Sequence, residues 1–299
     1  MKSPLRSVHT ATGRTPPMKR TIRARLPPAS PAARTSATAV PVPANQAPSD
    51  PRHPRLHRYE LPWSQWGAPN PDNVYRNNVA AGSDSNGFWM SLPEHPNGQF
   101  EGTEIAQTIW PRRTPMREFK GNVAHSNYDG FMFDRNIADD NTYALAGNTY
   151  LPLTDPNDPR SEALVTHFDD LVAYKNRNQG IWGRGELLLF RNLKAADNAI
   201  GVTISSGSFG TEKYTSLVTD SLFVGETDNV GNPRTPEEIA YGRSLPKPLI
   251  PDYPIRAYEY YDYRNEVQNT TFVNYQDNDR RKTGALSFLM FTSAGLSTG

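Results

Sequence analysis

Two tryptophans and three arginines have the chemistry to bind an acidic sugar. Trp89 and Trp182 each stand two residues after a glycine, and an indole ring packs well on the apolar face of a sugar ring. Arg184 lies two residues beyond Trp182, while Arg112 and Arg113 lie in a proline-rich segment. A guanidinium binds a carboxylate through two parallel hydrogen bonds, so these residues could bind a carboxylate-bearing sugar; the alternative is that the arginines pair with Asp and Glu on the surface.

Two carboxylic acids could supply hydrolytic chemistry. A glycoside hydrolase uses a pair of carboxyl groups that flank the scissile bond, whereas a lyase needs a base and a cation. Asp134 and Glu186 each follow the outward-facing part of an expected strand, so they are the catalytic pair that we would test. His125 is a third candidate, and the alternative for it is a structural hydrogen bond within its turn.

The sequence predicts no cofactor. It lacks cysteine and contains no H-E-x-x-H, no G-x-S-x-G and no phosphate-binding loop. The carboxylates in segments 155–158 and 277–279 could hold Ca²⁺, yet Asp and Asn also dominate ordinary turns. We therefore assign no metal site.

The segments around these candidates repeat one pattern. Each reads as a short strand, a polar turn rich in Asn and Asp, a glycine, and a second short strand. After the glycine the apolar residues alternate with period two, whereas a helix would need them at i, i+3, i+4 and i+7. The four segments are residues 78–90, 122–133, 170–182 and 192–204.

The glycine spacing predicts stacked coils. The glycines of the four segments are 43, 50 and 21 residues apart, and 21 residues make about one coil of a β-helix. The longer spacings then contain insertions at about 91–116 and 135–163, whose prolines cannot sit inside a central ladder. We predict a right-handed parallel β-helix over residues 59–299, with a β-sandwich of chance similarity as the alternative.

Equivalent residues of stacked coils form columns. Coils about 4.8 Å apart pair their backbones and bury together the apolar side that one coil cannot bury alone. The predicted columns are Val79, Val123, Leu171 and Leu193 (inward), Phe88, Phe131, Ile181 and Val202 (inward), and Asn78, Asn122 and Asn192 (an outward amide ladder).

The residues that follow the phenylalanine column should point outward. This expected stripe consists of Trp89, Met132, Trp182 and Thr203. The insertions leave just beyond it, so they could wall a groove with a tryptophan floor. The alternative is that the loops bury both tryptophans as a second small core, because large aromatic side chains are mostly buried.

The first 58 residues differ in composition from the rest. They hold eleven of the 27 prolines and eleven Lys and Arg against one acidic residue, whereas residues 59–299 carry a net charge of −9. We predict a disordered tail at 1–58, because it has too little apolar surface to offset its ordering entropy. A non-native segment and a transit peptide are the alternatives. The basic run is interpreted as solvated, so no nucleic-acid partner is predicted.

No apolar run approaches 18 residues, so the sequence predicts no membrane-spanning segment, and no secretory apolar region follows Met1. The negative charge of residues 59–299 means that an anionic ligand needs a local cluster of bases.

Five motifs occur in one order between about residues 70 and 299. They are NVAAGSDSNGFWMSLPEHPNG (78–98), EFKGNVAHSNYDGFMFDRN (118–136), NQGIWGRG (178–185), ADNAIGV (196–202) and DSLFVGETDN (220–229). Together they resemble the β-helix region of the family of the cell migration-inducing and hyaluronan-binding protein (CEMIP) and its transmembrane relative. The resemblance implies an all-β solenoid of the pectate-lyase type, an acidic polysaccharide such as hyaluronan as partner, and a place outside the cell or at its surface.

This chain also differs from the family in two ways. The eight-glycine domain that precedes the β-helix in the family is not recognised here, and the family's helix continues where this chain stops. We therefore expect an interior piece lacking coils at both ends, whose open strand edges would favour end-to-end self-association. Three functions stay open: an enzyme that cleaves the polysaccharide as a hydrolase or lyase, a non-catalytic binding or adhesion module, and an inactive fragment.

Overall fold

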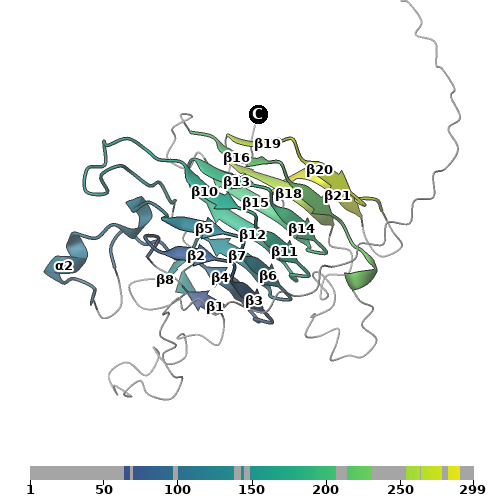
Figure 1. Ribbon diagram of the computed structural model, residues 1–299, viewed down its shortest axis with the longest axis horizontal. Helices are drawn as coiled ribbons and strands as arrows, with labels where there is room; N and C mark the ends of the chain where they lie inside the picture. Colours follow the sequence, from purple (N-terminus) through teal and green to yellow (C-terminus); the bar gives the residue numbers. More distant parts are fainter. Residues whose placement is uncertain are drawn as a thin grey trace, which may run out of the picture. The chain divides into compact units, whose positions relative to one another are not determined.

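The computed structural model contains a solenoid of parallel strands (Figure 1). The residues that it describes are 64–67, 70–96, 100–137, 143–144, 149–206, 214–230, 254–262, 264–277 and 282–289. The predicted tail, residues 1–58, lies outside these residues. None of the helices in the described ranges is long and apolar enough to cross a membrane.

Three parallel sheets account for most of the described structure. Sheet A consists of β1 (Ser64–Gly67), β4 (Asn86–Trp89), β7 (Asp129–Phe133), β12 (Gln179–Arg184), β15 (Ile200–Ser206), β18 (Ile255–Asp262) and β21 (Thr283–Phe288). Sheet B consists of β2 (Val74–Arg76), β5 (Glu118–Lys120), β10 (Thr166–Asp169), β13 (Leu188–Arg191), β16 (Ser216–Thr219) and β19 (Asn265–Gln268). Sheet C consists of β3 (Val79–Ala81), β6 (Val123–His125), β11 (Val172–Tyr174), β14 (Lys194–Ala196), β17 (Leu222–Val224) and β20 (Thr271–Val273).

Each coil visits the sheets in the order B, C, A, and each strand pairs in parallel with its equivalents in the neighbouring coils. The prediction of a parallel β-helix is confirmed.

Left-handed residues make the tight corners possible. A residue with positive φ precedes each strand of sheet C, and Asn, Asp and Gly tolerate this conformation best. These corner residues are Asn77, Gly121, Asp170, Asn192, Asp220 and Asn269, with φ between 43° and 66°. A second set follows several of the same strands and includes Ser126, Lys175 and Asp197. The polar turns of the sequence repeat are therefore the corners on either side of sheet C.

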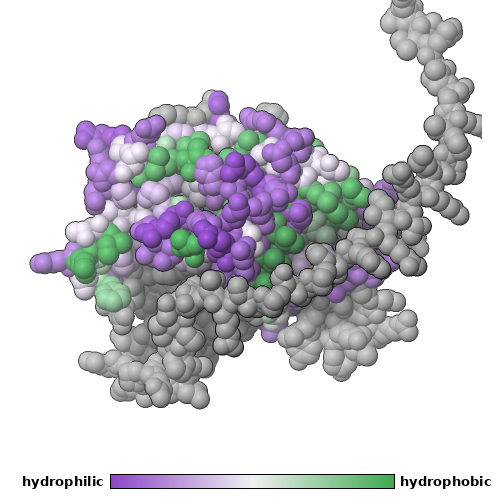
Figure 2. All heavy atoms as spheres, in the orientation of Figure 1, coloured by the Kyte–Doolittle hydropathy of each residue, from purple (hydrophilic) through white to green (hydrophobic). Residues whose placement is uncertain are grey.

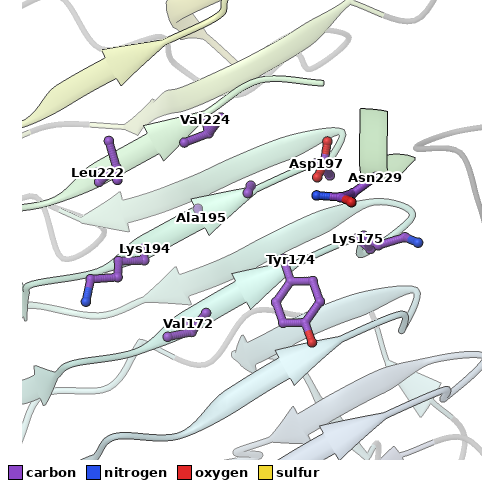
Figure 3. A pocket seen from close by; sticks show the side chains of 10 residues that line it. Val172, Tyr174, Lys175, Lys194, Ala195, Asp197, Leu222, Val224 and Asn229 are labelled. Atoms are coloured by element: carbon purple, nitrogen blue, oxygen red, sulfur yellow. The ribbon is translucent and has the colours of Figure 1, made fainter. Parts of the chain in front are cut away.

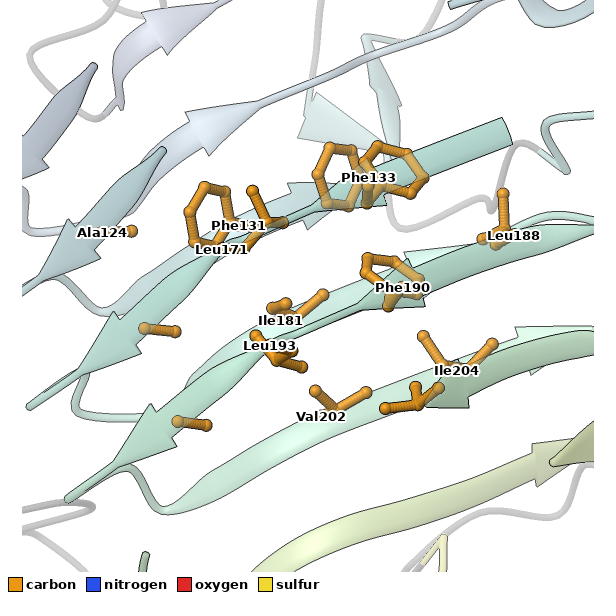
Figure 4. Packing of buried hydrophobic residues seen from close by; sticks show 14 of the residues in the cluster. Ala124, Phe131, Phe133, Leu171, Ile181, Leu188, Phe190, Leu193, Val202 and Ile204 are labelled. Atoms are coloured by element: carbon orange, nitrogen blue, oxygen red, sulfur yellow. The ribbon is translucent and has the colours of Figure 1, made fainter. Parts of the chain in front are cut away.

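The predicted phenylalanine column forms the centre of the core (Figure 4). Phe88 pairs with Phe131, Phe131 with Ile181, and Ile181 with Val202, and all four side chains are buried. The rings of Phe88 and Phe131 stack with centroids 4.9 Å apart. From sheet B a second aromatic column, Phe119, Phe168 and Phe190, packs against the first. The period-two prediction for sheet A is confirmed.

The predicted inward column of sheet C is wrong by one residue. Val79 is 56% exposed, and it pairs with Val123, which pairs with Val172, in an outward column. The inward column of sheet C consists of the alanines Ala80, Ala124, Ala173 and Ala195. Leu171 and Leu193 are buried, but they lie in the corner before the strand. Since side chains alternate along a strand, a shift by one residue reverses the face.

The predicted amide ladder is also corrected. Asn78 does bond to Asn122, with 3.2 Å between Nδ2 and Oδ1, but Asn122 is buried, and Asn192 stands one position earlier and bonds to Asp170. The fully stacked ladder lies in the corner between sheets C and A. There the backbone N–H of Asn127 donates to Oδ1 of Asn176, and that of Asn176 to Oδ1 of Asn198, at 3.2 and 3.0 Å. Such ladders satisfy the buried amides of a tight corner.

The two insertions contact each other. The first contains α2 (Glu104–Gln107) and η2 (Pro111–Arg113), and the second contains the antiparallel pair β8 (Asn136–Ile137) and β9 (Tyr143–Ala144). The backbone N–H groups of Leu151 and Leu153 donate to the carbonyls of Arg112 and Arg113. Tyr150 bridges to Gly185, beyond the end of β12, so the second insertion returns to the edge of sheet A.

Candidate functional site

The tryptophan stripe exists, but much of it is covered. Trp89 pairs with Met132, Met132 with Trp182, Trp182 with Thr203, and Thr203 with Glu259. Trp89 is only 4% exposed and Met132 and Thr203 are buried, whereas Trp182 is half-buried. An open floor that includes Trp89 is therefore wrong, and the alternative of a second small core holds for Trp89 and Met132. The physical reason is that aromatic surface beside long loops is buried more favourably than it is hydrated.

Asp134 binds the stripe together. Its Oδ2 accepts hydrogen bonds from Nε1 of Trp182 at 2.6 Å and from Nε of Arg184 at 2.9 Å. Its backbone carbonyl accepts a hydrogen bond from Nε1 of Trp89 at 3.0 Å. The Asp134 side chain is buried, so these contacts replace the water that an ionised carboxylate needs. Asp134 thus ties together three successive coils.

Arg184 is held in place by its neighbours. Burial lowers the pKa of its guanidinium, but the nearby charge and hydrogen bond of Asp134 outweigh burial, so the pKa is raised and the group stays charged. Its Nη1 also donates to Oγ of Ser205 at 2.9 Å, and its guanidinium lies 5.2 Å from the ring of Tyr261. The Trp182 and Tyr261 rings meet edge to face with centroids 5.8 Å apart. Of the stripe, Trp182 therefore stays accessible, and it forms one group with its neighbours Arg184 and Tyr261.

Glu186 lies near Asp134 on the next coil. Phe133 pairs with Gly183, so Glu186 stands two strand positions past the residue opposite Asp134. Both residues lie beyond the ends of their strands, β7 and β12. Glu186 is buried, and its Oε2 accepts a hydrogen bond from Oγ of Ser206 at 3.0 Å. Both carboxylates therefore lie in a buried, hydrogen-bonded setting at the edge of sheet A.

His125 does not join this pair. It lies in β6 of sheet C, and Asp134 follows β7 of sheet A. The His125 ring stacks on Tyr174 of the next coil, with centroids 4.7 Å apart and planes at 14°, and its Nδ1 lies 3.1 Å from Oγ of Ser126. Burial, aided by the positive charge of Lys175, lowers the pKa of His125. The structure therefore separates the third catalytic candidate from the other two.

Arg112 and Arg113 share one acidic partner in the first insertion. Glu94 lies 3.3 Å from Nη1 of Arg112 and 3.8 Å from Nη2 of Arg113. The Arg113 guanidinium also lies 3.9 Å from the centre of the Trp110 ring. The His95 ring contacts the same indole ring. These pairings stabilise the insertion and neutralise much of the positive charge that an anionic ligand would need.

The sequence analysis missed a buried ion pair at the far end of the stripe. Arg256 Nη2 lies 2.7 Å from Oε2 of Glu259, both side chains are almost fully buried, and Oγ1 of Thr203 donates to Oε1 of Glu259 at 3.1 Å. The sequence did contain a signal for this pair. Large and polar residues fall at equivalent positions in residues 258–261 (Tyr-Glu-Tyr-Tyr) and 202–205 (Val-Thr-Ile-Ser), so Glu259 corresponds to Thr203. The missing glycine in that coil hid the alignment.

The carboxylates considered for Ca²⁺ act in turns. Oδ1 of Asp155 accepts from the backbone N–H of Asn157, and Oδ1 of Asp158 from that of Arg160. Asp277 binds Lys282 and the backbone N–H of Thr283. Within the described ranges, no group of three or more His, Asp or Glu side chains is placed to hold a metal ion.

Comparisons with known proteins agree with the geometry. The model of the family described as CEMIP beta-helix matches residues 25–132, a span that begins inside the segment predicted to be a tail. The chain is 33% identical over 241 residues to the mouse cell migration-inducing and hyaluronan-binding protein, covering 73% of this chain and 17% of that protein.

Two further relatives extend the match. The chain is 33% identical over 245 residues to human cell surface hyaluronidase CEMIP2 (75% of this chain, 17% of that protein) and 27% identical over 267 residues to zebrafish cell surface hyaluronidase (83% and 17%). The chain thus spans about a sixth of the length of these relatives. With its stacked parallel coils, it belongs to the CEMIP family as a β-helix region.

Proposed function

We propose that this β-helix region binds an acidic polysaccharide of the hyaluronan class, outside the cell or at its surface. The observation that carries the proposal is the 33% identity, over about three quarters of the chain, to relatives named for hyaluronan binding and as a cell surface hyaluronidase. The aligned share is large enough to include most of the coils. The polysaccharide and the location are inferred for this chain from those names.

A parallel β-helix suits a polymeric ligand. Its outer faces repeat every coil, so one ligand chain can contact equivalent positions on several coils. On sheet A the available groups are Trp182, Arg184 and Tyr261, which combine aromatic surface with one guanidinium. Asp134 already neutralises Arg184 in large part, so this group alone supports aromatic stacking better than it supports charge recognition.

The test is a binding experiment with the full chain. Immobilised hyaluronan should retain the protein, an uncharged polysaccharide of similar length should not, and added salt should weaken retention. Equal retention by both polymers, or by neither, would contradict the proposal. Light scattering on the same sample measures end-to-end self-association, which stays a prediction.

Depolymerisation is a second candidate function, favoured by the placement of Asp134 and Glu186. In an inverting hydrolase one carboxyl group protonates the leaving oxygen and the other activates water, and Asp134 and Glu186 follow neighbouring strands of sheet A. Asp134 pairs with Arg184, and Glu186 accepts a hydrogen bond from Ser206.

The assay for cleavage is the chain length of hyaluronan after incubation. The wild-type chain should shorten the polymer, and Glu186→Gln should abolish shortening while leaving retention on hyaluronan intact. Asp134→Asn should abolish shortening too, but it also disturbs Trp182 and Arg184, which Asp134 holds. An unchanged polymer in the presence of a binding-competent wild-type chain would assign the region to binding alone.

A further inference from the structure

The outer face of sheet C carries a hollow of about 450 Å³ across β11, β14 and β17 (Figure 3). Its floor is apolar, and its rim is polar. The lining residues are Val172, Tyr174, Lys175, Lys194, Ala195, Ala196, Asp197, Leu222, Val224 and Asn229. A volume in this range and an apolar floor with a few polar groups are typical of sites for small ligands or for single units of a polymer.

The floor arises from the outward columns of sheet C. Val172 pairs with Lys194 and Lys194 with Leu222, while Tyr174 pairs with Ala196 and Ala196 with Val224. The small Ala196 side chain between Tyr174 and Val224 leaves the depression. In the space-filling view, apolar residues form separate patches interrupted by hydrophilic ones (Figure 2).

An aromatic wall borders the hollow. Tyr174 is half-buried, and its ring is supported by the nearly parallel ring of His125 in the preceding coil. A ring fixed in this way offers a pre-oriented flat surface, which lowers the entropy lost when a sugar stacks on it.

Two lysines give the hollow its charge. In the part of the chain that the structure describes, Lys175 and Lys194 form no ion pair, in contrast to Arg112, Arg113 and Arg184. They stand at opposite ends of the site with Tyr174 between them (Figure 3). Lys194 is the first residue of β14 and pairs with Val172, whereas Lys175 lies in the corner that follows β11, so the two lysines flank the hollow.

The acidic residue of the rim is engaged elsewhere. Oδ1 of Asp197 accepts from the backbone N–H of Thr227 at 2.6 Å, and its Oδ2 accepts from Oγ1 of Thr227 at 2.9 Å. These two bonds fix the start of η3 (Asp228–Val230), which carries Asn229, at the edge of the hollow. Asp197 therefore shapes the wall and interacts electrostatically with Lys175, so the lining of the hollow carries two lysines against one carboxylate.

We propose that the Tyr174–Lys175–Lys194 hollow is a subsite for a uronate-containing sugar chain, with Tyr174 stacking on one ring and the two lysines binding carboxylates. This inference rests on the proposed function and locates it on sheet C. A polymer in which a uronate alternates with an uncharged amino sugar carries its carboxylates on every second ring, which fits two cations on either side of one aromatic platform.

The test uses the full chain and a short hyaluronan oligosaccharide. The variant Lys175→Gln/Lys194→Gln removes both charges and keeps the side-chain stems, so it should fold normally. Each exposed ion pair contributes modestly, so affinity should fall roughly threefold to thirtyfold. The salt dependence should become shallower in the variant. Tyr174→Ala should weaken binding as well, whereas Tyr174→Phe should retain it.

The control is Lys282→Gln, which removes an exposed lysine distant in sequence that pairs with Asp277. It should bind as the wild type does. A wild-type chain that binds while Lys175→Gln/Lys194→Gln binds equally well would overturn this subsite and leave the proposed function in place. A wild-type chain that does not bind hyaluronan at all would overturn the proposed function itself.

Discussion

Replacing Asp134 by asparagine tests whether the stripe on sheet A is held together by a buried charge. The substitution keeps the shape of the side chain and one acceptor for Trp182, but it leaves Arg184 charged without its partner. The Arg184 side chain is 16% exposed. Removing one partner of a buried pair costs about 3–5 kcal/mol, and because water reaches part of Arg184 we expect about 3 kcal/mol.

The control is a more exposed Asp–Arg pair. Arg191 and Asp169 are joined by two hydrogen bonds of 2.8 and 2.9 Å, but the Arg191 side chain is 47% exposed. Asp169→Asn should therefore cost less than about 1 kcal/mol.

Equilibrium unfolding in urea measures both losses on the full chain. Combining Asp134→Asn with Arg184→Met should cost less than the two single changes added together, because the second change removes the unpaired charge. A loss for Asp134→Asn no larger than that for Asp169→Asn would refute the buried-pair reasoning.

Three further predictions concern the coils. Leu171→Ala should lower the free energy of unfolding by about 2–5 kcal/mol, whereas Val79→Ala should change it by less than about 0.5 kcal/mol. Similar losses for the two variants in chemical unfolding would support the register in which Val79 points inward. Gly180→Ala should cost about 1–3 kcal/mol, because a Cβ there would lie 2.5 Å from the carbonyl oxygen of Gly201, and an unchanged unfolding midpoint would mean that the coils lie further apart. His125 has a lowered pKa in the folded state, so the unfolded chain binds more protons and stability should fall as pH drops through about 6.5; unfolding at about pH 7.5 and 5.5 should show a smaller change for His125→Gln, and an equal change would exclude His125 as a source.

The sequence predicted the coils because glycine-centred repeats carry long-range information. The carbonyl oxygen of each coil approaches the glycine of the coil before it, as Gly180 O approaches Gly130 and Gly201 O approaches Gly180, so the glycines mark equivalent places. Large alternating residues such as Phe131 and Ile181 then gave the correct face of sheet A. Length and spacing also gave the two insertions.

The register of sheet C could not be predicted from the sequence, for a physical reason. Its inward residues are alanines such as Ala124 and Ala173, which carry a weak hydrophobic signal, while Leu171 is buried in the corner beside them. A pattern of apolar residues therefore favours the leucine as part of the strand. Only the strand pairing shows that Leu171 occupies the position of the buried Asn122.

The burial and the ion pairing of the candidate side chains depend on partners that are distant in sequence. Asp134 and Arg184 are fifty residues apart, and the stripe is covered on a face from which two insertions depart. Neither the path of a loop nor the pairing of its charges follows from local sequence. The hollow on sheet C was missed for the same reason, because only the register places Tyr174 and Lys194 on the same outer face of neighbouring coils.

The most direct test of the central claim is the affinity of the full chain for a hyaluronan oligosaccharide, measured at low and high salt for the wild type, Lys175→Gln/Lys194→Gln and Lys282→Gln. The account predicts salt-sensitive binding that the double change weakens and the control change leaves intact. The absence of wild-type binding, or equal affinity for an uncharged oligosaccharide, would contradict it.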